Sequence, residues 1–212
     1  MENSRVCDTN NQEDLRACMK VLRAFHNQNI QVKHIFDLYG QLEYYEKLWN
    51  GRKSIYQDYE LTKKHILSLR SFVEGNAKRK TLTHIDAVPD NFMIQILENG
   101  KQDIRLIDWE YAGMQDPDLD IAMFSIYSLY EREQIDNLIS IYYENKVDLV
   151  TKYKIYAYVA IAGLLWSNWC EYKRLLGVDF GEYSLKQYRY AKVYYRIVQE
   201  EFLSHQKGEK DE

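Results

Sequence analysis

Residues that break regular structure are scarce in this chain, and their scarcity limits the folds open to it. The 212 residues include only two prolines and nine glycines. Sandwiches and barrels of many short strands need turn residues every few positions, whereas long helices do not. The sequence therefore predicts a mainly helical chain, and at this length one domain is the default.

Composition and charge exclude several classes of protein. Hydrophobic residues make up 46% of the chain and charged residues 28%, which is typical of an ordered globular protein. The net charge is −4 and no long basic run occurs, so nucleic acid is not expected as a main partner. The longest uncharged run, residues 155–170, is shorter than the ~20 apolar residues of a membrane span and predicts a buried helix.

The cysteines indicate a reducing compartment. Cys7, Cys18 and Cys170 are odd in number and widely spaced, and no CxxC pair occurs. Neither a disulfide framework nor a zinc site is expected from such spacing. Residues 1–12 are mostly polar, so no secretion signal is expected. We therefore expect reduced thiols and a cytoplasmic location.

Helical periodicity covers most of the chain. The first helix is expected to begin at caps among Asp8, Thr9 and Asn10, and the third to end before Gly75. The expected helices are about 11–27, 35–50, 54–74, 119–130, 132–145, 151–176 and 183–205.

A short extended region interrupts the helices. Thr81–Thr83 has β-type composition, and residues 92–97 and 104–107 flank a turn that contains Asn99 and Gly100. Two apolar runs around Asn-Gly predict a β-hairpin. Because the extended residues lie together between two helical halves, we expect the chemistry of the protein at this small sheet.

Polar residues at both ends of the predicted hairpin form a kinase-type pattern. His84 and Asp86 are followed five residues later by Asn91, and Asp108 comes directly after the second strand. Phosphoryl transfer needs a carboxylate to orient the attacking hydroxyl and oxygen ligands for Mg²⁺. Asp86 is the candidate base, with Asn91 and Asp108 as candidate metal ligands. Each residue alone is weak evidence, because His-x-Asp arises by chance and a lone Asp after a strand often only forms a turn.

Two segments carry a resemblance to a known family. Residues 84–91 read HIDAVPDN and residues 106–113 read LIDWEYAG. They resemble the catalytic and metal-binding segments of the choline/ethanolamine kinase family, within the aminoglycoside phosphotransferase-like kinases of protein-kinase-like fold. The resemblance covers about residues 1–200. It implies ATP-dependent, Mg²⁺-dependent phosphorylation of the choline hydroxyl to phosphocholine, with His84 and Asp86 in the catalytic loop and Asp120 supporting that loop.

The same resemblance implies four substrate-binding residues. Glu110 and Tyr111 resemble the choline-kinase version of their motif, and Trp166 and Trp169 resemble a tryptophan pair of the choline pocket. Aromatic faces attract a quaternary ammonium by cation–π interaction. By periodicity alone, however, aromatics three residues apart on an apolar helix are more often core. Ethanolamine, another amino alcohol or an aminoglycoside remain alternative substrates.

The nucleotide-binding part of such a kinase is not evident in the sequence. No two of the nine glycines lie closer than four residues, so GxGxxG is impossible, and no GxxxxGK[ST] occurs. Residues 2–7 resemble the hinge strand between the two lobes. We therefore expect a C-terminal lobe alone, without the β-rich N-terminal lobe and with little or no activity unaided. Its expected parts are a hinge remnant (1–8), a helical catalytic lobe (9–205) with the catalytic hairpin at 81–110, and a flexible tail (206–212).

A non-catalytic choline-binding module is the second class of function that stays open. The missing nucleotide machinery favours it. The complete set of His84, Asp86, Asn91 and Asp108 disfavours it, because a pure binding protein has no need of metal ligands.

Overall fold

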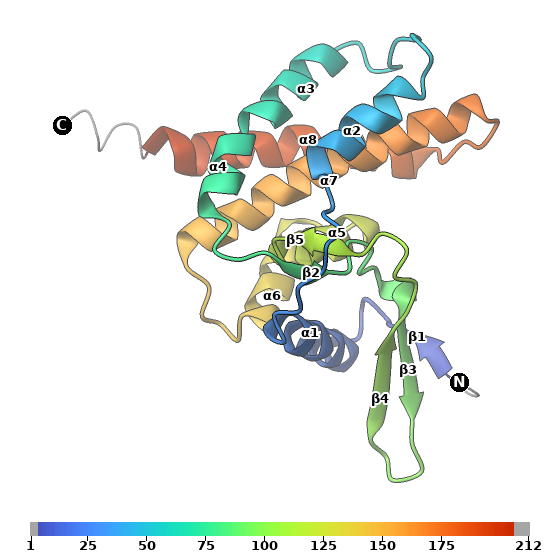
Figure 1. Cartoon of the computed structure of the whole chain (residues 1–212), viewed down its shortest axis with the longest axis vertical. Coiled ribbons are helices and arrows are strands. Elements are labelled where there is room, and N and C mark those ends of the chain that lie inside the picture. The colour runs from blue at the N-terminus through green and yellow to red at the C-terminus, as the bar shows by residue number, and fades with distance from the viewer. Residues whose placement is uncertain (1–3, 206–212) are drawn as a thin grey trace. The chain divides into compact units, whose positions relative to one another are not determined.

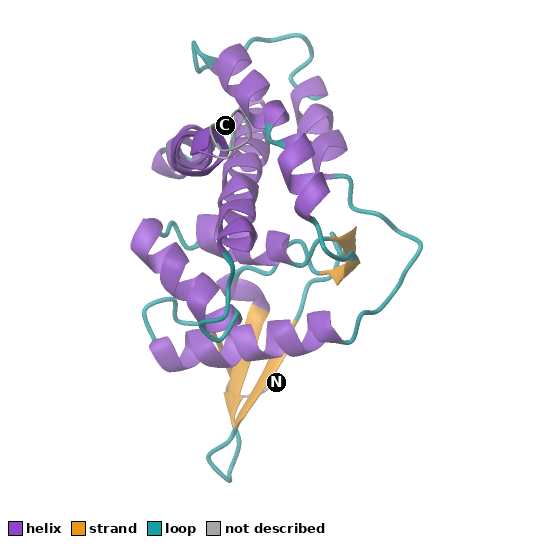
Figure 2. Ribbon diagram, turned by 90° about the vertical axis from the view of Figure 1, so that its left-hand side faces the viewer, coloured by secondary structure: helices purple, strands orange, loops and turns teal. Residues whose placement is uncertain are grey.

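The computed structural model describes residues 4–205, and most of them are helical (Figures 1 and 2). This confirms the mainly helical fold that the scarcity of proline and glycine predicts. The helices are α1 (Gln12–Asn27), α2 (Leu38–Lys47), α3 (Tyr59–Ser68), α4 (Arg70–Asn76), α5 (Asp118–Tyr127), α6 (Arg132–Tyr142), α7 (Leu149–Leu175) and α8 (Glu182–Val198). A 3₁₀ turn (Pro89–Asn91) precedes the hairpin and a π-helical turn (Gln199–Leu203) follows α8.

The strands form two small antiparallel sheets. They are β1 (Ser4–Val6), β2 (Thr81–Thr83), β3 (Phe92–Ile96), β4 (Gln102–Leu106) and β5 (Gly113–Gln115). One sheet has the order β1-β3-β4, and the other pairs β2 with β5. The predicted hairpin is confirmed as β3–β4, and its turn places Gly100 at a φ of 76°, a conformation that glycine adopts without strain. The residues of β5 were not predicted to be extended.

The chain divides into two compact units. The first comprises Met1–Phe36 and Lys78–Asp148, and the second Asp37–Ala77 and Leu149–Glu212. The first unit therefore holds both sheets with α1, α5 and α6, and the second holds α2, α3, α4, α7 and α8. The predicted tail, 206–212, lies outside the described residues.

In the first unit, α1 packs on α6 through an apolar face. Leu15, Met19 and Leu22 recur at the helical spacing of three to four residues and are buried. The cap is Asn11, whose side chain accepts hydrogen bonds from the next turn, and not one of residues 8–10 as predicted. Asp8 instead accepts a hydrogen bond from the Asn10 amide, which forms a turn before the helix.

An ion pair fastens β1 to α1. The Arg5 guanidinium donates to both carboxylate oxygens of Asp14, with 2.8 Å from Nη2 to Oδ1. Arg5 is half-exposed, but only 1% of the Asp14 side chain is exposed. The hydrogen bond from Arg5 lowers the pKa of Asp14. The pair therefore stabilises the fold most where the Asp14 carboxylate is ionised.

This ion pair makes stability depend on pH. A lowered folded-state pKa gives stability that is present above the ordinary Asp pKa of about 3.9 and is lost as the pH falls below it. We expect Asp14→Asn to lower the urea midpoint at neutral pH, and the difference from wild type to shrink below that value. Glu13→Gln, an exposed neighbour in the same helical turn, is the control and should change little. A difference in urea midpoint between Asp14→Asn and wild type that is the same at every pH would contradict this role of the ion pair.

The second unit is organised around α7, which is buried along most of its length. It packs against α8, and the two helices lie close together at Gly163, where a β-carbon would lie 2.7 Å from the carbonyl oxygen of Gln187. A larger residue at this position would therefore push the two helices apart. Although α7 is long, no helix in residues 4–205 combines the length and apolar character needed to cross a bilayer.

The structure corrects two predicted helices of the second unit. The helix expected at 35–50 begins at Leu38, because Phe36 is extended and Asp37 caps α2 by accepting from the Gly40 amide. The helix expected at 54–74 is two helices, α3 and α4, and Gly75 lies inside α4. The first residues of the predicted helix lie outside α3 because Ser54 Oγ and the Ile55 amide both donate to the Glu171 carboxylate, at 2.5 and 3.0 Å.

The other predicted helices exist with shifted ends. α5 and α6 end several residues earlier than expected, and both are followed by residues with positive φ, Leu129 at 55° and Asn145 at 61°. α7 starts two residues earlier than expected. These are ordinary end effects and leave the assignment of each helix unchanged.

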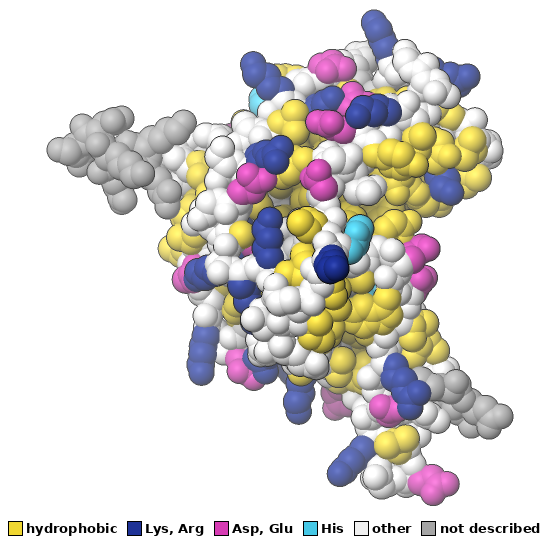
Figure 3. Space-filling model, viewed as in Figure 1, with side chains coloured by type: hydrophobic (Ala, Val, Ile, Leu, Met, Phe, Trp, Pro, Cys, Tyr) yellow, Lys and Arg dark blue, Asp and Glu magenta, His cyan; other side chains and the backbone are white. Residues whose placement is uncertain are grey.

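Charged side chains are mixed on the face seen in Figure 3. Basic, acidic and apolar side chains alternate there without one broad patch of either sign. Such a face gives no extended electrostatic footprint for a polyanion.

Candidate active site

Residues 84–91 form a loop between β2 and β3 that brings two of the predicted site residues together. The 3₁₀ turn at its end directs the Asn91 side chain back to Asp86. Asn91 Nδ2 donates to the backbone oxygen of Asp86 at 2.8 Å and to its Oδ2 at 3.1 Å. Asp86 is half-buried and Asn91 is buried. One carboxylate oxygen of Asp86 is therefore held in a fixed direction.

The hairpin brings Asp108 to the same place. Phe92 pairs with Leu106 in the β3–β4 register, so Asn91 and residue 107 follow at the same end. The Ile107 amide donates to the backbone carbonyl oxygen of Asn91 at 3.0 Å, and the exposed Asp108 comes next with a φ of 63°. The structure thus places Asn91 and Asp108 at one end of the hairpin, as the sequence argument expects for two ligands of one ion.

Asp120 lies beneath the loop and holds its backbone. Its two carboxylate oxygens accept from the His84 amide at 3.0 Å and from the Ile85 amide at 2.7 Å. Ile85 has a φ of 71°, a left-handed conformation that costs a β-branched residue of the order of 1–3 kcal/mol. The bonds to Asp120 offset this cost, and the loop turns where it carries Asp86.

Two further residues complete a buried chain of hydrogen bonds. His26 Nε2 lies 2.9 Å from Asp120 Oδ2, and His26 Nδ1 lies 2.7 Å from the Tyr142 hydroxyl. Because a carboxylate only accepts, His26 donates to Asp120 from Nε2. Burial raises the pKa of Tyr142, which keeps its hydroxyl proton for this network. Sequence reasoning did not find His26 or Tyr142, because neither belongs to a local motif.

His84 is placed inside the fold. Its Nε2 lies 2.9 Å from the carbonyl oxygen of Ile107 and so donates to it. Its ring packs edge to face with that of Trp109, with the two ring centroids 4.5 Å apart. Its Nδ1 is buried and has no hydrogen-bond partner among the described residues. This geometry ties the loop of residues 84–91 to the residue before Asp108.

The local charge sets the chemistry of Asp86. Burial raises the pKa of Asp86, and the carboxylates of Asp108 and Asp120 raise it further. The hydrogen bond from Asn91 and the nearby His84 act in the opposite direction. A carboxylate that is crowded by two others and oriented by an amide is a suitable acceptor for the proton of an attacking hydroxyl.

The donor set at the hairpin end suits a hard cation. The amide nitrogen of Asn91 is occupied by Asp86, which leaves the amide oxygen available. Asp108 is exposed, and among residues 4–205 its carboxylate has no hydrogen-bond donor. Within the same residues, no group of three or more His, Cys, Asp or Glu side chains could hold an ion by itself. Mg²⁺ usually takes one or two protein oxygens and completes its shell with water and phosphate, so the pair fits it.

The four predicted substrate-binding residues divide between the two units. Glu110 is exposed and Tyr111 half-buried in the turn between Asp108 and β5 of the first unit. Trp166 and Trp169 lie on α7 of the second unit, with their ring centroids 5.4 Å apart and nearly perpendicular. Both tryptophans are half-exposed although most of α7 is buried, which weighs against the reading as core.

A third aromatic residue joins the tryptophan pair. The ring of Phe180 lies 4.9 Å from that of Trp169, and the Lys173 ammonium lies 5.3 Å from the centre of the same ring. Phe180 is in the loop between α7 and α8, where no periodicity marks it. Sequence reasoning therefore missed it.

Comparison with known proteins decides the family. Residues 4–160 match the sequence model of the choline/ethanolamine kinase family. The chain belongs to this family.

Relatives of known sequence or structure agree with the assignment. The LicA protein of Haemophilus influenzae is 28% identical over 200 residues, which cover 88% of this chain and 72% of that protein. The crystal structure of choline kinase LicA from Streptococcus pneumoniae superposes with a TM-score of 0.75 at 26% identity, over 92% of this chain and 67% of that one. A structure of LicA in complex with AMP superposes with a TM-score of 0.77 at 26% identity. The match covers 93% of this chain and 67% of the chain in that structure. The predicted protein-kinase-like fold is thereby confirmed, and the chain spans about two thirds of the solved relatives.

Proposed function

We propose that this chain carries the catalytic and alcohol-binding part of a kinase that transfers the γ-phosphoryl group of ATP to the hydroxyl of choline. The observation that carries the proposal is the meeting of Asp86, Asn91 and Asp108 at one end of the hairpin. Membership of the choline/ethanolamine kinase family and the AMP complex of a relative support ATP as co-substrate.

The roles of the site residues follow from their geometry. Asp86 accepts the proton of the choline hydroxyl and orients its oxygen for in-line attack. Asn91 holds the Asp86 carboxylate, and the oxygens of Asn91 and Asp108 would hold Mg²⁺. When bound, the ion neutralises the phosphate oxygens. His84 and Asp120 act through the loop by fixing its backbone.

The alcohol is proposed to be held by its trimethylammonium group. The faces of Trp166 and Trp169, with Phe180 beside them, offer the aromatic surface that such a cation prefers. By family resemblance Glu110 and Tyr111 serve the same substrate, with the carboxylate countering the positive charge. The buried, unpaired cysteines are compatible with the cytoplasm, where we propose that the reaction takes place.

Phosphorylation assays test the proposal. A chimera that joins the nucleotide-binding lobe of Streptococcus pneumoniae LicA to this chain should phosphorylate choline faster than ethanolamine or an aminoglycoside. The chain unaided should show little or no activity, because its sequence has neither GxGxxG nor GxxxxGK[ST]. Robust ATP-dependent phosphorylation of choline by the chain alone would overturn that part of the proposal. A faster reaction with ethanolamine would reassign the substrate.

A non-catalytic choline-binding module is the second candidate, favoured by the absence of those glycine motifs. Calorimetry separates the two candidates. Choline binding by a chimera that neither binds Mg²⁺-nucleotide nor turns over would support the module.

The tryptophan pair gives a sharper prediction about choline. We expect Trp169→Ala to weaken choline binding about tenfold or more, since a desolvated cation–π contact contributes roughly 2 kcal/mol. The affinity of the chimera for ATP should not change. Trp169→Phe should keep much of the binding, and Tyr153→Ala, sixteen residues away on α7 and so about 24 Å along the helix, should have no effect. Equal losses for choline and ATP would count against the aromatic site.

A further inference from the structure

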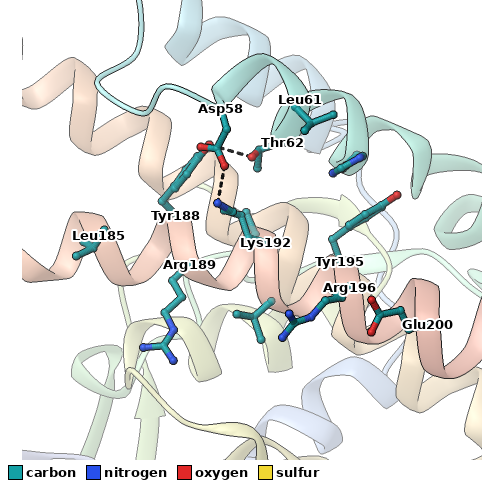
Figure 4. A pocket seen from close by; sticks show the side chains of 13 residues that line it. Asp58, Leu61, Thr62, Leu185, Tyr188, Arg189, Lys192, Tyr195, Arg196 and Glu200 are labelled. Carbon is teal, nitrogen blue, oxygen red and sulfur yellow. Dashed lines mark hydrogen bonds and ion pairs between the residues drawn. The ribbon is translucent and has the colours of Figure 1, made fainter.

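A cavity separate from all predicted site residues lies along α3 and α8 of the second unit (Figure 4). Its volume is about 660 Å³, within the usual range for small-ligand sites of ~300–1,000 Å³. α3 contributes Leu61, Thr62 and His65, α8 contributes a strip of residues from 185 to 196, and the π-helical turn contributes Glu200. We call it the α3–α8 groove.

The floor of the groove is apolar and open to solvent. Leu61 on α3 is 55% exposed and Leu185 on α8 is 59% exposed, which is unusual for two leucines facing one hollow. Val193, which is half-buried, extends the apolar surface along α8. Covering these side chains would remove apolar area from water and so favour a ligand with an apolar part.

One wall of the groove is fixed by paired groups. The Tyr188 hydroxyl donates to Asp58 Oδ1 at 2.8 Å and lies 2.9 Å from Thr62 Oγ1. Lys192 forms an ion pair with Asp58, and its hydrogen bond lowers the pKa of that carboxyl. Figure 4 shows Lys192 directed towards Asp58 at the start of α3. The charges of Lys192 and Asp58 therefore offset each other.

The opposite edge carries positive charge without a partner. Arg189 and Arg196 line the groove, leave α8 on the side away from α3 in Figure 4, and form no ion pair among residues 4–205. Glu200 is the one further carboxylate on the lining. Apart from the Asp58–Lys192 pair, the lining therefore carries two guanidinium groups and one carboxylate, an excess of positive charge. This local excess occurs in a chain whose net charge is −4.

We propose that the α3–α8 groove binds a small amphiphilic anion. Its apolar part lies over Leu185 and Val193, which share a stripe of α8 with the two arginines, and its phosphate or carboxylate meets Arg189 and Arg196. Guanidinium groups bind such anions bidentately. Arginines seven residues apart begin about 10.5 Å apart along the helix, a gap that two long side chains can close on one anion. The proposal concerns a second site and stands independently of the kinase reaction.

Titration calorimetry with three probes tests the proposal on the chain as it is. Octyl phosphate, which has both parts, should bind with a stoichiometry of one and at least about tenfold more tightly than inorganic phosphate or 1-octanol. Across butyl, hexyl and octyl phosphate, affinity should rise up to about fourfold per methylene, since each buried CH₂ contributes roughly 0.8 kcal/mol.

Variants locate the site. Arg189→Gln and Arg196→Gln should each weaken the binding of octyl phosphate about tenfold, the loss expected when one charge-assisted contact is removed. Leu185→Ser should weaken the binding of octyl phosphate and make the affinity depend less on the length of the alkyl chain. Lys64→Gln is the control, because Lys64 is exposed on α3 but does not line the groove, and it should change nothing.

Several results would overturn the proposal. Equal affinity for octyl phosphate and inorganic phosphate would mean that the surface binds anions without using the apolar floor. Equal affinity for octyl phosphate and 1-octanol would mean that the groove binds apolar chains without using the arginines. Binding to phosphatidylglycerol vesicles without binding of monomeric octyl phosphate would mean a membrane contact. Self-association that Arg189→Gln abolishes, without octyl phosphate binding, would mean an interface between copies. An equal loss in Lys64→Gln would mean attraction by general charge.

Discussion

Replacing Asp120 with alanine is expected to lower the free energy of unfolding by about 3–5 kcal/mol, the usual cost of removing one partner from a buried charged network. Asp120 is fully buried and accepts from the His84 amide, the Ile85 amide and His26. Its removal leaves three buried donors unpaired, each costing roughly 1–3 kcal/mol before the structure relaxes. Urea denaturation of the chain measures the change.

Two variants sharpen this test of Asp120. Asp120→Asn keeps an acceptor oxygen and should cost less than alanine. Glu133→Gln, an exposed carboxylate on α6, should stay within about 0.5 kcal/mol of wild type, as ordinary surface substitutions do. A loss below about 1 kcal/mol for Asp120→Ala would contradict the support that we assign to this residue.

The second large effect concerns catalysis by Asp86. In the chimera with the nucleotide-binding lobe, we expect Asp86→Asn to reduce kcat about 10²–10⁴-fold, the range that a positioned general base contributes. Asparagine has nearly the same shape and can still accept from Asn91, so the loop should keep its conformation. What is lost is the carboxylate that we propose takes up the proton of the choline hydroxyl. Steady-state rates of phosphocholine formation measure the effect.

Choline binding separates this catalytic role of Asp86 from a structural one. The choline Kd and the urea midpoint of Asp86→Asn should remain close to wild type while kcat falls. Glu98→Gln, an exposed carboxylate at the far end of the same hairpin, is the matched control and should leave the rate unchanged. Parallel losses in rate and stability would show that Asp86 only maintains the loop.

Local sequence was sufficient for the hairpin and for the neighbourhood of three site residues. Asn99 and Gly100 mark the turn, and the two apolar runs fix the pairing of β3 with β4. Once that register is known, Asn91 and Asp108 must lie at one end. The family resemblance added the proposed substrate, which spacing alone does not supply.

Contacts between distant segments were beyond the reach of the sequence. His26 meets Asp120 across 94 residues, and Tyr142 meets His26 across 116. The late start of α3 has a similar origin, because Ser54 and Ile55 at the start of the predicted helix donate to Glu171, more than a hundred residues later. Helical periodicity describes one segment at a time, so it cannot predict such a capture.

The chain of hydrogen bonds through Asp120 also bears on the order of folding. The amides of His84 and Ile85 acquire their bonds only when Asp120 of α5 has docked beneath the loop, and Asp120 is held in turn through His26 of α1 and Tyr142 of α6. These segments are distant in sequence, and closing such long loops has an entropic cost before any contact compensates. Helices form early and locally, so a collapsed chain can have native helical content while this loop is still unformed. Hydrogen exchange at the His84 and Ile85 amides is therefore a stricter criterion of the native state than circular dichroism: these two amides should be protected only in molecules whose first unit is completely folded.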